Sequence, residues 1–348
     1  MINFTKHLVK KGTPLNDVLI QLNLLKEDKI LFIVENDLTF LGTITDGDIR
    51  RGLLEKVSLK QKIESIQQTR PKFFYEKKIA LNELITLRKS GYKVIPILDD
   101  NKRIIKVINF NNIKSFLPLD AIIMAGGRGI RLSPLTNKIP KSLLKIGRKP
   151  IMEHNLDRLI SFGIKDFLFS VNYLKDQIKT HFNFGKEHVN IQYIEETKPM
   201  GTIGALSLID NIKNEHVLVT NSDILTNIDY EDFYLDFLKN DADISMVTIP
   251  YEVVIPYGVV NGKQNQVKGI QEKPTYTYYS NAGIYLMKRD VLFSIPKNIF
   301  FNATDLITNE LSKNKKVISY SFSGYWLDIG KPEDYKRAQT DIKHINFD

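Results

Sequence analysis

The strongest candidate for chemistry in this sequence is a glycine-rich segment with cations around it. Three glycines and two arginines lie together in Met124–Leu132, and Lys141 follows nine residues later. Glycine has no Cβ, so the backbone N–H groups of such a segment can close around phosphate oxygens. Arg128, Arg131 and Lys141 can supply positive charge to a polyphosphate. The segment is not a Walker loop, and its spacing departs from the Rossmann Gly-x-Gly-x-x-Gly pattern.

Two carboxylates stand at the ends of strand-like runs. Asp223 closes the run Val217–Asp223, and Asp328 closes the run Tyr325–Asp328. Carboxylates at strand ends can hold Mg²⁺, which prefers oxygen ligands and keeps phosphates and water in its other positions. A lone aspartate at a strand end is more often a turn or cap residue. The joint presence of the glycine-rich segment favours the metal.

The elements that must position these residues alternate along the chain. An apolar strand at Leu119–Ala125 runs directly into the glycines, Glu153–Ile160 has helical periodicity, and Asp166–Val171 and His216–Thr220 are strand-like. This alternation is typical of a mostly parallel sheet covered by helices. The glycine-rich segment then falls at a carboxyl end of a strand, where α/β sheets present their ligands.

The N-terminal part contains an internal repeat with a period of roughly 60 residues. Each copy has a strand-like run, a turn, a second strand-like run and a helix-like segment. The runs are Lys29–Val34, Phe40–Thr45 and Asp46–Arg51 in the first copy, and Lys93–Leu98, Ile104–Ile108 and Asn111–Phe116 in the second. We therefore predict two domains, residues 1–117 and residues 118–348, with the boundary near Leu117-Pro118.

Composition places the chain among ordinary globular proteins. It is 43% hydrophobic and 26% charged over 348 residues, has no cysteine, and has no run of the roughly 20 apolar residues that a membrane span needs. The start lacks the apolar core of a secretory signal. The absence of cysteine excludes disulfides, thiolate metal sites and a cysteine nucleophile, and it fits a reducing compartment, so we expect a cytoplasmic protein.

Positive charge is concentrated in the N-terminal part. Residues 1–119 carry 21 Lys and Arg against 13 Asp and Glu, which is +8 of the total of +9. Such an excess can attract nucleic acid, anionic lipid or a phosphorylated small molecule. Because the lysines are scattered rather than clustered with aromatic residues, a solvated surface is the favoured interpretation. We expect neither nucleic acid nor a membrane as partner.

Met124–Leu132 and Ile139–Leu144 together resemble the signature of the sugar-phosphate nucleotidyltransferases, also called NDP-sugar pyrophosphorylases. The resemblance implies a mixed, mostly parallel, Rossmann-like sheet of the GT-A type. It also implies an enzyme that joins a sugar 1-phosphate to a nucleoside triphosphate and releases pyrophosphate. The alternative, in a different class, is a catalytically silent sensor of sugar nucleotides that keeps the fold.

The resemblance assigns the nucleotide and its phosphates to the glycine-rich segment. It implies that Gly126, Gly127 and Gly129 wrap the nucleotide, that Arg131 holds the triphosphate and that Lys141 neutralises phosphates during transfer. Arg131 and Lys141 are therefore the catalytic candidates. A sugar 1-phosphate is already an anion, so charge neutralisation and positioning are the main tasks. None of the six histidines lies in a motif, which fits direct displacement without a covalent intermediate.

Further motifs support the resemblance. It assigns Asp223 and Asp328 to Mg²⁺. Lys198–Leu206 is similar to the segment of the family that contacts base and ribose, which nominates Gly201 and Thr202.

The sugar phosphate is assigned to two later segments. Gly269–Pro274 resembles the Glu-Lys-Pro element, in which Glu272 would bind sugar hydroxyls and Lys273 the phosphate. Tyr279–Tyr285 resembles the segment that closes the sugar pocket, which nominates Asn281 and Gly283.

One residue bears on the choice of base. Glu196 lies five residues before Gly201, where thymidylyl members of the family carry a glutamine that reads the base. An ionised carboxylate only accepts hydrogen bonds, and guanine offers two adjacent donors where uracil offers one. We therefore predict GTP first and UTP second, with Glu195 as the alternative reader. Mannose 1-phosphate and glucosamine-type 1-phosphates are the candidate sugars, and we expect no acetyltransferase domain.

The repeated N-terminal part resembles a tandem CBS module, best in Gly42–Arg50. The resemblance implies an adenine-nucleotide site at Thr45 and Asp48 and self-association through the module. The second copy departs from the pattern, with Asn109 and Asn112 in the places of Thr45 and Asp48. A purely structural or dimerising module is the alternative. Proteins of this outline are associated with activated sugars for bacterial surface glycans.

Overall fold

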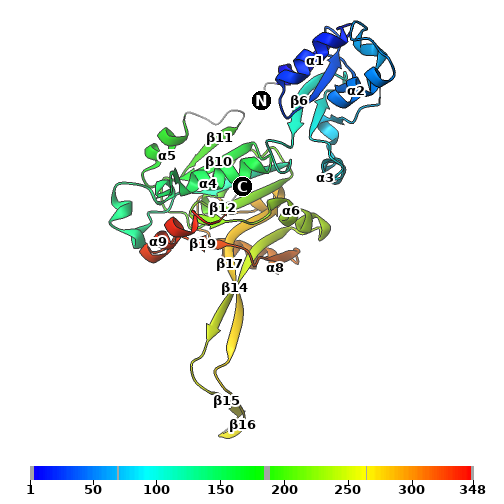
Figure 1. Ribbon diagram of the computed structural model, residues 1–348. Coiled ribbons are helices and arrows are strands. Elements are labelled where there is room, and N and C mark those ends of the chain that lie inside the picture. The colour runs from blue at the N-terminus through cyan, green and yellow to red at the C-terminus, as the bar shows by residue number, and fades with distance from the viewer. Residues whose placement is uncertain (1–3, 69, 184–188, 264, 346–348) are drawn as a thin grey trace. The chain divides into compact units, whose positions relative to one another are not determined.

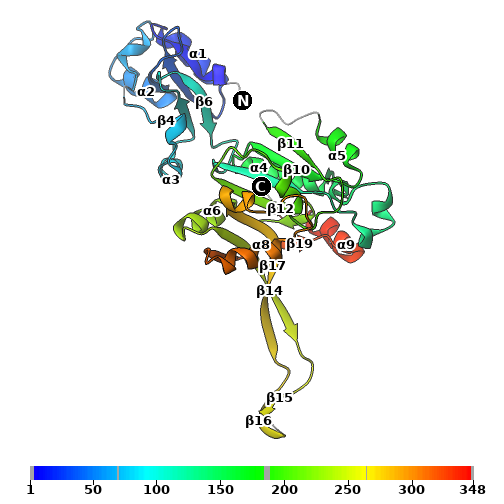
Figure 2. The same ribbon diagram turned by 180° about the vertical axis from the view of Figure 1, so that it is seen from behind.

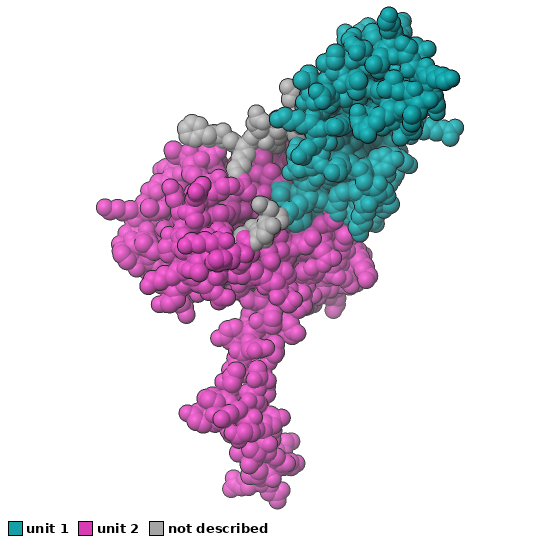
Figure 3. All heavy atoms as spheres, in the orientation of Figure 1, with its two compact units in different colours: residues 1–117, 161–163 teal, residues 118–160, 164–348 magenta. Residues whose placement is uncertain are grey.

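The computed structural model describes residues 4–68, 70–183, 189–263 and 265–345. Contacts divide the chain into two compact units, shown in different colours in Figure 3. Unit 1 comprises residues 1–117 and 161–163, and unit 2 comprises residues 118–160 and 164–348. The short stretch 161–163 in unit 1 was not indicated by the sequence.

Unit 1 contains the predicted repeat as two small α/β sheets (Figure 1). The first copy consists of β1 (Leu8–Lys10), α1 (Leu15–Leu24), β2 (Ile30–Val34), β3 (Phe40–Thr45) and α2 (Asp46–Leu54). The second consists of β4 (Phe74–Tyr75), α3 (Leu81–Lys89), β5 (Val94–Leu98) and β6 (Ile104–Asn109). In each sheet the middle strand pairs parallel with the first strand and antiparallel with the last. The repeat is therefore confirmed at the level of topology.

The expected helix at residues 111–116 is wrong. These residues form a turn and irregular backbone, because the side chain of Asn109 competes with helix formation. Its Oδ1 accepts a hydrogen bond from Asn111 N at 2.9 Å, and its carbonyl accepts from Asn112 N and Ile113 N. Local side-chain bonds of this kind favour turns over helices, and Pro118 further disfavours helical backbone at the residue before it.

The two sheets of unit 1 share apolar packing. Phe32 and Val34 of the first copy lie in one buried cluster with Val94 and Leu98 of the second. The apolar runs that the sequence showed at these strands are thus explained by burial between the copies, since a half-exposed strand would alternate.

Unit 2 is built on a mixed seven-stranded sheet in the order β11-β10-β7-β12-β17-β14-β18. Its strands are β7 (Leu119–Met124), β10 (Asp166–Val171), β11 (Asn190–Glu195), β12 (His216–Asn221), β14 (Ile244–Val254), β17 (Thr275–Lys288) and β18 (Val317–Ser321). Within the described residues, β17 alone runs opposite to the other strands. The prediction of a mostly parallel α/β sheet is confirmed.

Helices and small strand pairs surround this sheet, which Figures 1 and 2 show from opposite sides. The helices are α4 (Ile151–Ser161), α5 (Lys175–Phe182), α6 (Tyr230–Lys239), α7 (Arg289–Phe293), α8 (Ala303–Ser312) and α9 (Pro332–Asp341). The small pairs are β8 (Lys145–Ile146) with β9 (Lys149–Pro150), β13 (Ile224–Thr226) with β19 (Trp326–Asp328), and β15 (Val259–Lys263) with β16 (Gln266–Gln271). Val217 and Val219 of β12 pack in one cluster with Leu292 of α7 and Leu306 of α8. These two helices therefore cover one face of the sheet, because alternate residues of a strand share a face.

Strands β14 and β17 extend beyond the sheet as a two-stranded ribbon. Their register shifts at a bulge between Met246 and Thr248, and regular antiparallel pairing then continues to Val254 opposite Thr275. The pair β15–β16 lies at the far end of this ribbon, which Figure 1 shows leading away from the sheet. We call residues 250–280 the arm. Among the described residues, no helix is long and apolar enough to cross a membrane.

Candidate active site

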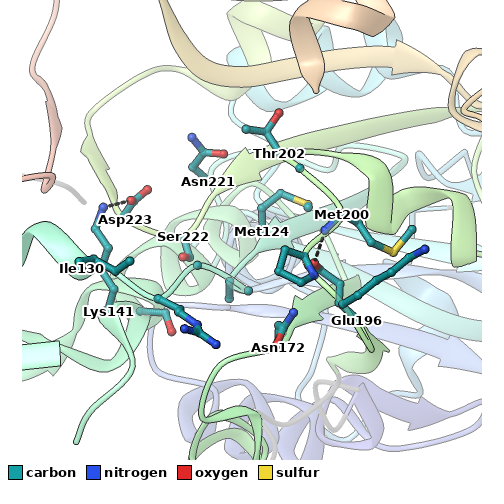
Figure 4. Close-up of a pocket in the computed structure, with 18 of the residues that line it drawn as sticks. Met124, Ile130, Lys141, Asn172, Glu196, Met200, Thr202, Asn221, Ser222 and Asp223 are labelled. Carbon is teal, nitrogen blue, oxygen red and sulfur yellow. Dashed lines mark hydrogen bonds and ion pairs between the residues drawn. The ribbon is translucent and has the colours of Figure 1, made fainter. Parts of the chain in front are cut away.

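A cavity of about 550 Å³ lies at the carboxyl ends of the parallel strands of unit 2 (Figure 4). Met124 ends β7, Asn172 follows β10, Glu196 follows β11 and Asn221 ends β12, and all four line the cavity. This is the edge at which parallel α/β sheets bind ligands. The fold therefore brings the sequence motifs that follow these strands to one place.

The glycine-rich segment forms part of the cavity wall. Gly126 and Gly127 line it, whereas Gly129 does not. Gly129 has a φ of +62°, and a Cβ placed there would lie 3.0 Å from both Lys141 Cβ and Thr136 Cγ2. Thr136 Oγ1 also donates a hydrogen bond to the Gly129 carbonyl at 2.9 Å. Gly129 thus permits the turn that brings Lys141 against the loop.

Lys141 connects the loop to the two aspartates. Its Nζ donates to Asp223 Oδ2 and lies 3.6 Å from Asp328 Oδ1. Antiparallel pairing of β13 with β19 sets Ile224 opposite Asp328, which places the two carboxylates side by side. Figure 4 shows the contact between Lys141 and Asp223 at the cavity wall. The residues assigned to phosphate and metal therefore converge.

The side chain of Asp328 has an unsatisfied oxygen. Its Oδ1 is buried and accepts no hydrogen bond from the described residues. Burial raises the pKa of Asp328, and the negative charge of Asp223 raises it further, while Lys141 and Arg131 act in the opposite direction. A cation that approached Asp328 Oδ1 would relieve both effects.

Arg131 lies beside the second carboxylate and does not line the cavity. A Cβ placed at Gly330 would lie 3.3 Å from Arg131 Nη2 and 3.4 Å from Asp328 Oδ2. The structure thus groups Arg131 with Asp328, and the sequence had given no indication of that neighbour.

Glu196 is fixed at the cavity wall by two donors. Ser170 Oγ donates to Glu196 Oε1 at 2.9 Å, and Met200 N donates to Oε2 at 3.3 Å. Ser170 is fully buried near the end of β10. Gly126 makes room for this carboxylate, because a Cβ placed there would lie 2.6 Å from Glu196 Oε1. Sequence reasoning missed Ser170 and Met200, since a serine in a strand and a methionine beside a glycine carry no signal of their own.

Glu195 points to a different environment from Glu196. Its carboxylate accepts hydrogen bonds from Lys175 and Lys179, which lower the pKa of Glu195 to about 2. It is not among the described residues that line the cavity. Of the two adjacent acids, Glu196 alone is therefore placed to contact a ligand there.

Gly201 and Thr202 lie in a loop tied to the start of α8. Gly201 has a φ of +83°, and a Cβ there would lie 2.5 Å from the Phe301 carbonyl oxygen. Thr202 N donates to Asn302 Oδ1 at 3.2 Å, and Thr202 Oγ1 accepts from Ala303 N at 2.9 Å. Both residues line the cavity, and these bonds hold the loop in place.

The four residues assigned to the sugar phosphate lie outside the cavity lining. Glu272 and Lys273 are exposed in the arm, because the pairing of β14 with β17 carries them away from the sheet. At the base of the arm, Asn281 Nδ2 donates to Tyr285 Oη at 2.7 Å. Gly283 has a φ of +73°, and a Cβ there would lie 2.6 Å from Asn221 Nδ2. Gly283 thus adjoins a cavity residue, whereas Glu272 and Lys273 do not reach the cavity of their own chain.

Unit 1 has a cavity of its own, also of about 550 Å³. Thr45 and Asp48 line it and form a capping box at the start of α2, in which Thr45 N donates to Asp48 Oδ2 at 2.8 Å. Asp48 Oδ1 accepts from Arg51 and Gln68. Five cations line the same cavity, namely Lys29, Arg51, Arg70, Lys72 and Lys93, against the three carboxylates of Glu27, Asp28 and Asp48. The cavity therefore offers positive charge to an anionic ligand.

Comparison with known proteins identifies relatives of unit 2. Residues 120–344 match the model of the nucleotidyl transferase family. A mannose-1-phosphate guanyltransferase of Yarrowia lipolytica is 31% identical over 233 residues, which is 62% of this chain and 62% of that relative. The chain thus spans less than two thirds of the length of this relative.

Two solved structures are also similar to this chain. HddC from Yersinia pseudotuberculosis, complexed with GMP-PN, is 26% identical with a TM-score of 0.51, over 64% of this chain and 99% of that one. A putative glucose-1-phosphate thymidylyltransferase from Bacillus anthracis, in complex with a sucrose, is 26% identical with a TM-score of 0.54, over 66% and 97%.

Proposed function

The chain belongs to the nucleotidyl transferase family, and from that premise we propose that it condenses a hexose 1-phosphate with GTP to give a GDP-sugar and pyrophosphate. The observation that carries the proposal is the convergence of Gly126, Lys141 and Asp223 on the cavity at the carboxyl ends of the parallel strands, with Asp328 3.6 Å from Lys141. A mannose-1-phosphate guanyltransferase among the relatives supports the reaction and the base. A mannose- or glucosamine-type sugar is the proposed acceptor.

The proposed step is a direct displacement at the α-phosphorus. An oxygen of the sugar 1-phosphate forms a new P–O bond, the bond to the bridging oxygen of the pyrophosphate breaks, and the pyrophosphate leaves with the electron pair. The attacking oxygen is already ionised, so no base is needed. Lys141 neutralises the charge that two anions bring together, and backbone N–H groups at Gly126 and Gly127 contact phosphate oxygens. Inversion at a chirally labelled phosphorus checks the single displacement, and retention would contradict it.

Asp223 and Asp328 are proposed to hold Mg²⁺. The residues fit the ion, because Asp328 Oδ1 is buried without a hydrogen-bond donor among the described residues and a second carboxylate lies beside it. The described residues contain no group of three or more potential ligands of the His, Asp and Glu type, so phosphate oxygens and water would fill the other positions. When bound, Mg²⁺ would supply positive charge to the phosphates.

Glu196 is proposed to read guanine. Ser170 and Met200 use one hydrogen bond on each carboxylate oxygen, which leaves each oxygen able to accept another. Guanine N1–H and the N2 amine are adjacent donors that match this pair. HddC, whose structure is described as complexed with GMP-PN, supports a guanine ligand in this fold. ITP lacks the N2 amine, so we expect GTP to be preferred over ITP and over UTP.

The proposal is tested by pyrophosphate release from a matrix of four triphosphates and several sugar 1-phosphates. We expect the highest kcat/KM with GTP, and an Asp223→Ala variant with at least about 100-fold lower activity, as for removal of a group that stabilises transition-state charge. Asp210→Ala is the matched control, since Asp210 is exposed and does not line the cavity. Preference for ATP or CTP would refute the role of Glu196. No release from any pair would favour the sensor.

For unit 1 we propose a tandem CBS module that binds an adenine nucleotide and self-associates. The repeated topology and the cationic cavity that contains Thr45 and Asp48 support it. Calorimetry of the full chain with AMP and ATP tests the binding. Lys72→Ala should weaken it, whereas Lys60→Ala should not, because Lys60 is exposed and outside the cavity lining. Equal binding by both variants would place the nucleotide elsewhere.

The location and pathway are also proposals. We propose that the protein acts in a bacterial cytoplasm and that its product serves surface glycan synthesis. The chain has no cysteine, which suits a reducing compartment. Cell fractionation checks the location.

A further inference from the structure

The arm exposes an unusual amount of apolar surface. Its exposed large apolar side chains are Tyr251, Val253, Val254, Tyr257, Val260, Val267, Ile270, Tyr278 and Tyr279. The four tyrosines are exposed by 60%, 75%, 59% and 64%. An isolated two-stranded ribbon is at best marginally stable in water, so this surface indicates that the arm packs against something.

One face of the arm is distinctly aromatic. Tyr251 pairs with Tyr278, and Val253 pairs with Tyr276. Directly paired residues point to the same face of a ribbon, and residues two apart share it. These four side chains therefore form one face, whereas Glu252 and its partner lie on the other. Tyr279 and Val254 lie on that other face, and both are exposed. The arm therefore exposes apolar side chains on both of its faces.

The arm also separates two halves of the proposed site. Regular pairing runs without interruption from Thr248 opposite Asn281 to Val254 opposite Thr275. At about 3.3 Å per residue, the far end of this stretch lies roughly 20 Å beyond the sheet. Glu272 and Lys273 follow there, at a break in the ribbon. The cavity, as far as the structure describes it, is lined by residues assigned to nucleotide and metal but by neither of these two.

We propose that the arm docks on a second copy of this chain and brings Glu272 and Lys273 to the cavity of that copy. The inference rests on the proposed function, in which these side chains contact the sugar hydroxyls and phosphate. Two-fold exchange of arms completes both sites at once, because a closed dimer uses the same surfaces reciprocally. Each site then takes its nucleotide residues from one chain and its sugar-phosphate residues from the other.

The apolar area of the arm agrees with an interface of this kind. Aromatic side chains bury about 150–250 Å² each. At their exposed fractions, the four tyrosines offer roughly 500 Å² on the two faces and the end of the arm together, so a partner must enclose the arm to cover this surface. The exposed valines and isoleucine add to this and bring the arm near the ~800 Å² that each partner contributes to a standard interface. A second copy is always present and carries the same arm, so the exchange covers both arms.

Mixed dimers test the exchange. We would co-express an Asp223→Ala chain, which has an intact arm, with a Lys273→Ala chain, which has an intact cavity, and purify doubly tagged dimers. Each variant alone should be inactive, and the mixed dimer should recover about half of the wild-type rate, because one of its two sites is complete. The control pairs Asp223→Ala with Asp328→Ala chains. It should stay inactive because both residues are assigned to the metal half of the site, so neither site of the mixed dimer is complete.

An active wild type whose mixed dimers are as inactive as their parents would overturn the proposal. A second measurement works without activity, since the chain has no cysteine. A Lys273→Cys chain mixed with a Thr197→Cys chain, whose Thr197 lines the cavity, should form a disulfide-linked dimer under oxidation. A double variant that forms the link only within one chain would show that the arm folds back on its own cavity. Cross-linked dimers of the two cysteine variants, together with a wild type that releases no pyrophosphate from any substrate pair, would refute the proposed function and retain the exchange.

Discussion

Replacement of Gly126 by alanine tests the proposed contact of Glu196 with the base, while the backbone N–H groups proposed to bind phosphate remain. The backbone at Gly126 is not in the left-handed region, so alanine adds no backbone strain. Its Cβ would lie 2.6 Å from Glu196 Oε1 and 3.4 Å from Asn172 Cβ. The Glu196 carboxylate must retreat by roughly 0.6–0.8 Å to reach ordinary contact distance. That movement would disturb its 2.9 Å hydrogen bond from Ser170.

The magnitude follows from the hydrogen bonds at stake. A hydrogen bond to a charged group contributes about 1.5–3 kcal/mol, and 1.4 kcal/mol corresponds to about tenfold in an equilibrium constant. Misaligning Glu196 should therefore lower kcat/KM for GTP by about 10–100-fold. ITP makes one bond fewer to the carboxylate, so it should lose less. We expect the ratio of kcat/KM for GTP to that for ITP to fall by about tenfold.

Steady-state pyrophosphate release with GTP and ITP measures this ratio, and thermal unfolding confirms that the variant is folded. Gly127→Ala is the matched control, because a Cβ at Gly127 meets nothing within 4 Å. It should affect both triphosphates equally. In a Glu196→Ala background the carboxylate is gone, so adding Gly126→Ala should change the ratio no further. An unchanged ratio in Gly126→Ala, or additive effects in the double variant, would refute this account of Glu196.

Three further outcomes are expected. Asp328→Asn should reduce pyrophosphate release at least about 100-fold. It should nevertheless raise the melting temperature in metal-free buffer, because it removes a negative charge held beside the carboxylate of Asp223. A lower melting temperature would contradict this expectation. Gly201→Ala should lower the free energy of unfolding by about 1–3 kcal/mol in urea titrations, since its φ of +83° is strained for alanine and its Cβ would meet the Phe301 carbonyl. Gly269→Ala is the control, as a Cβ there meets nothing within 4 Å, and equal effects would be inconsistent with the strain. Burial of His7 lowers its pKa below the ordinary value of 6.5, so the unfolded chain binds a proton more readily than the folded chain. The contribution of His7 to the free energy of unfolding is therefore fully present above pH 6.5 and is lost as the pH drops below that value. A His7→Gln variant should lose this part of the pH dependence, and an unaltered profile would argue against it.

The sequence was most informative where structure depends on neighbours along the chain. The apolar run of β7 and the glycines that follow it are contiguous, so the loop and its place at the strand end could be predicted. The repeat in unit 1 was visible for the same reason. The helix expected at residues 111–116 failed on a single side chain, that of Asn109, whose turn bonds do not appear in any periodicity.

Contacts between residues far apart in the sequence could not be predicted from composition or periodicity. That Asp223 and Asp328 lie side by side depends on the register of β13 and β19, and it was expected only through the family resemblance. Ser170 looks like any strand serine until β11 brings Glu196 to it. The departure of the arm from the sheet was equally hidden, because both parts of β14 and β17 contain β-branched and aromatic residues, which are typical of strands whether or not further strands lie beside them.

The pairing of β13 with β19 joins two segments that the ribosome synthesises at well-separated times. The glycine-rich loop and Lys141 leave the ribosome early, and Asp223 follows, but Asp328 is synthesised more than one hundred residues later. Strands β7, β10 and β12 are synthesised before that residue, whereas β19, which positions it, comes after them. Contacts so far apart in sequence form slowly. A nascent chain therefore passes through a stage that has the glycine-rich loop, Lys141 and Asp223 but not the second carboxylate.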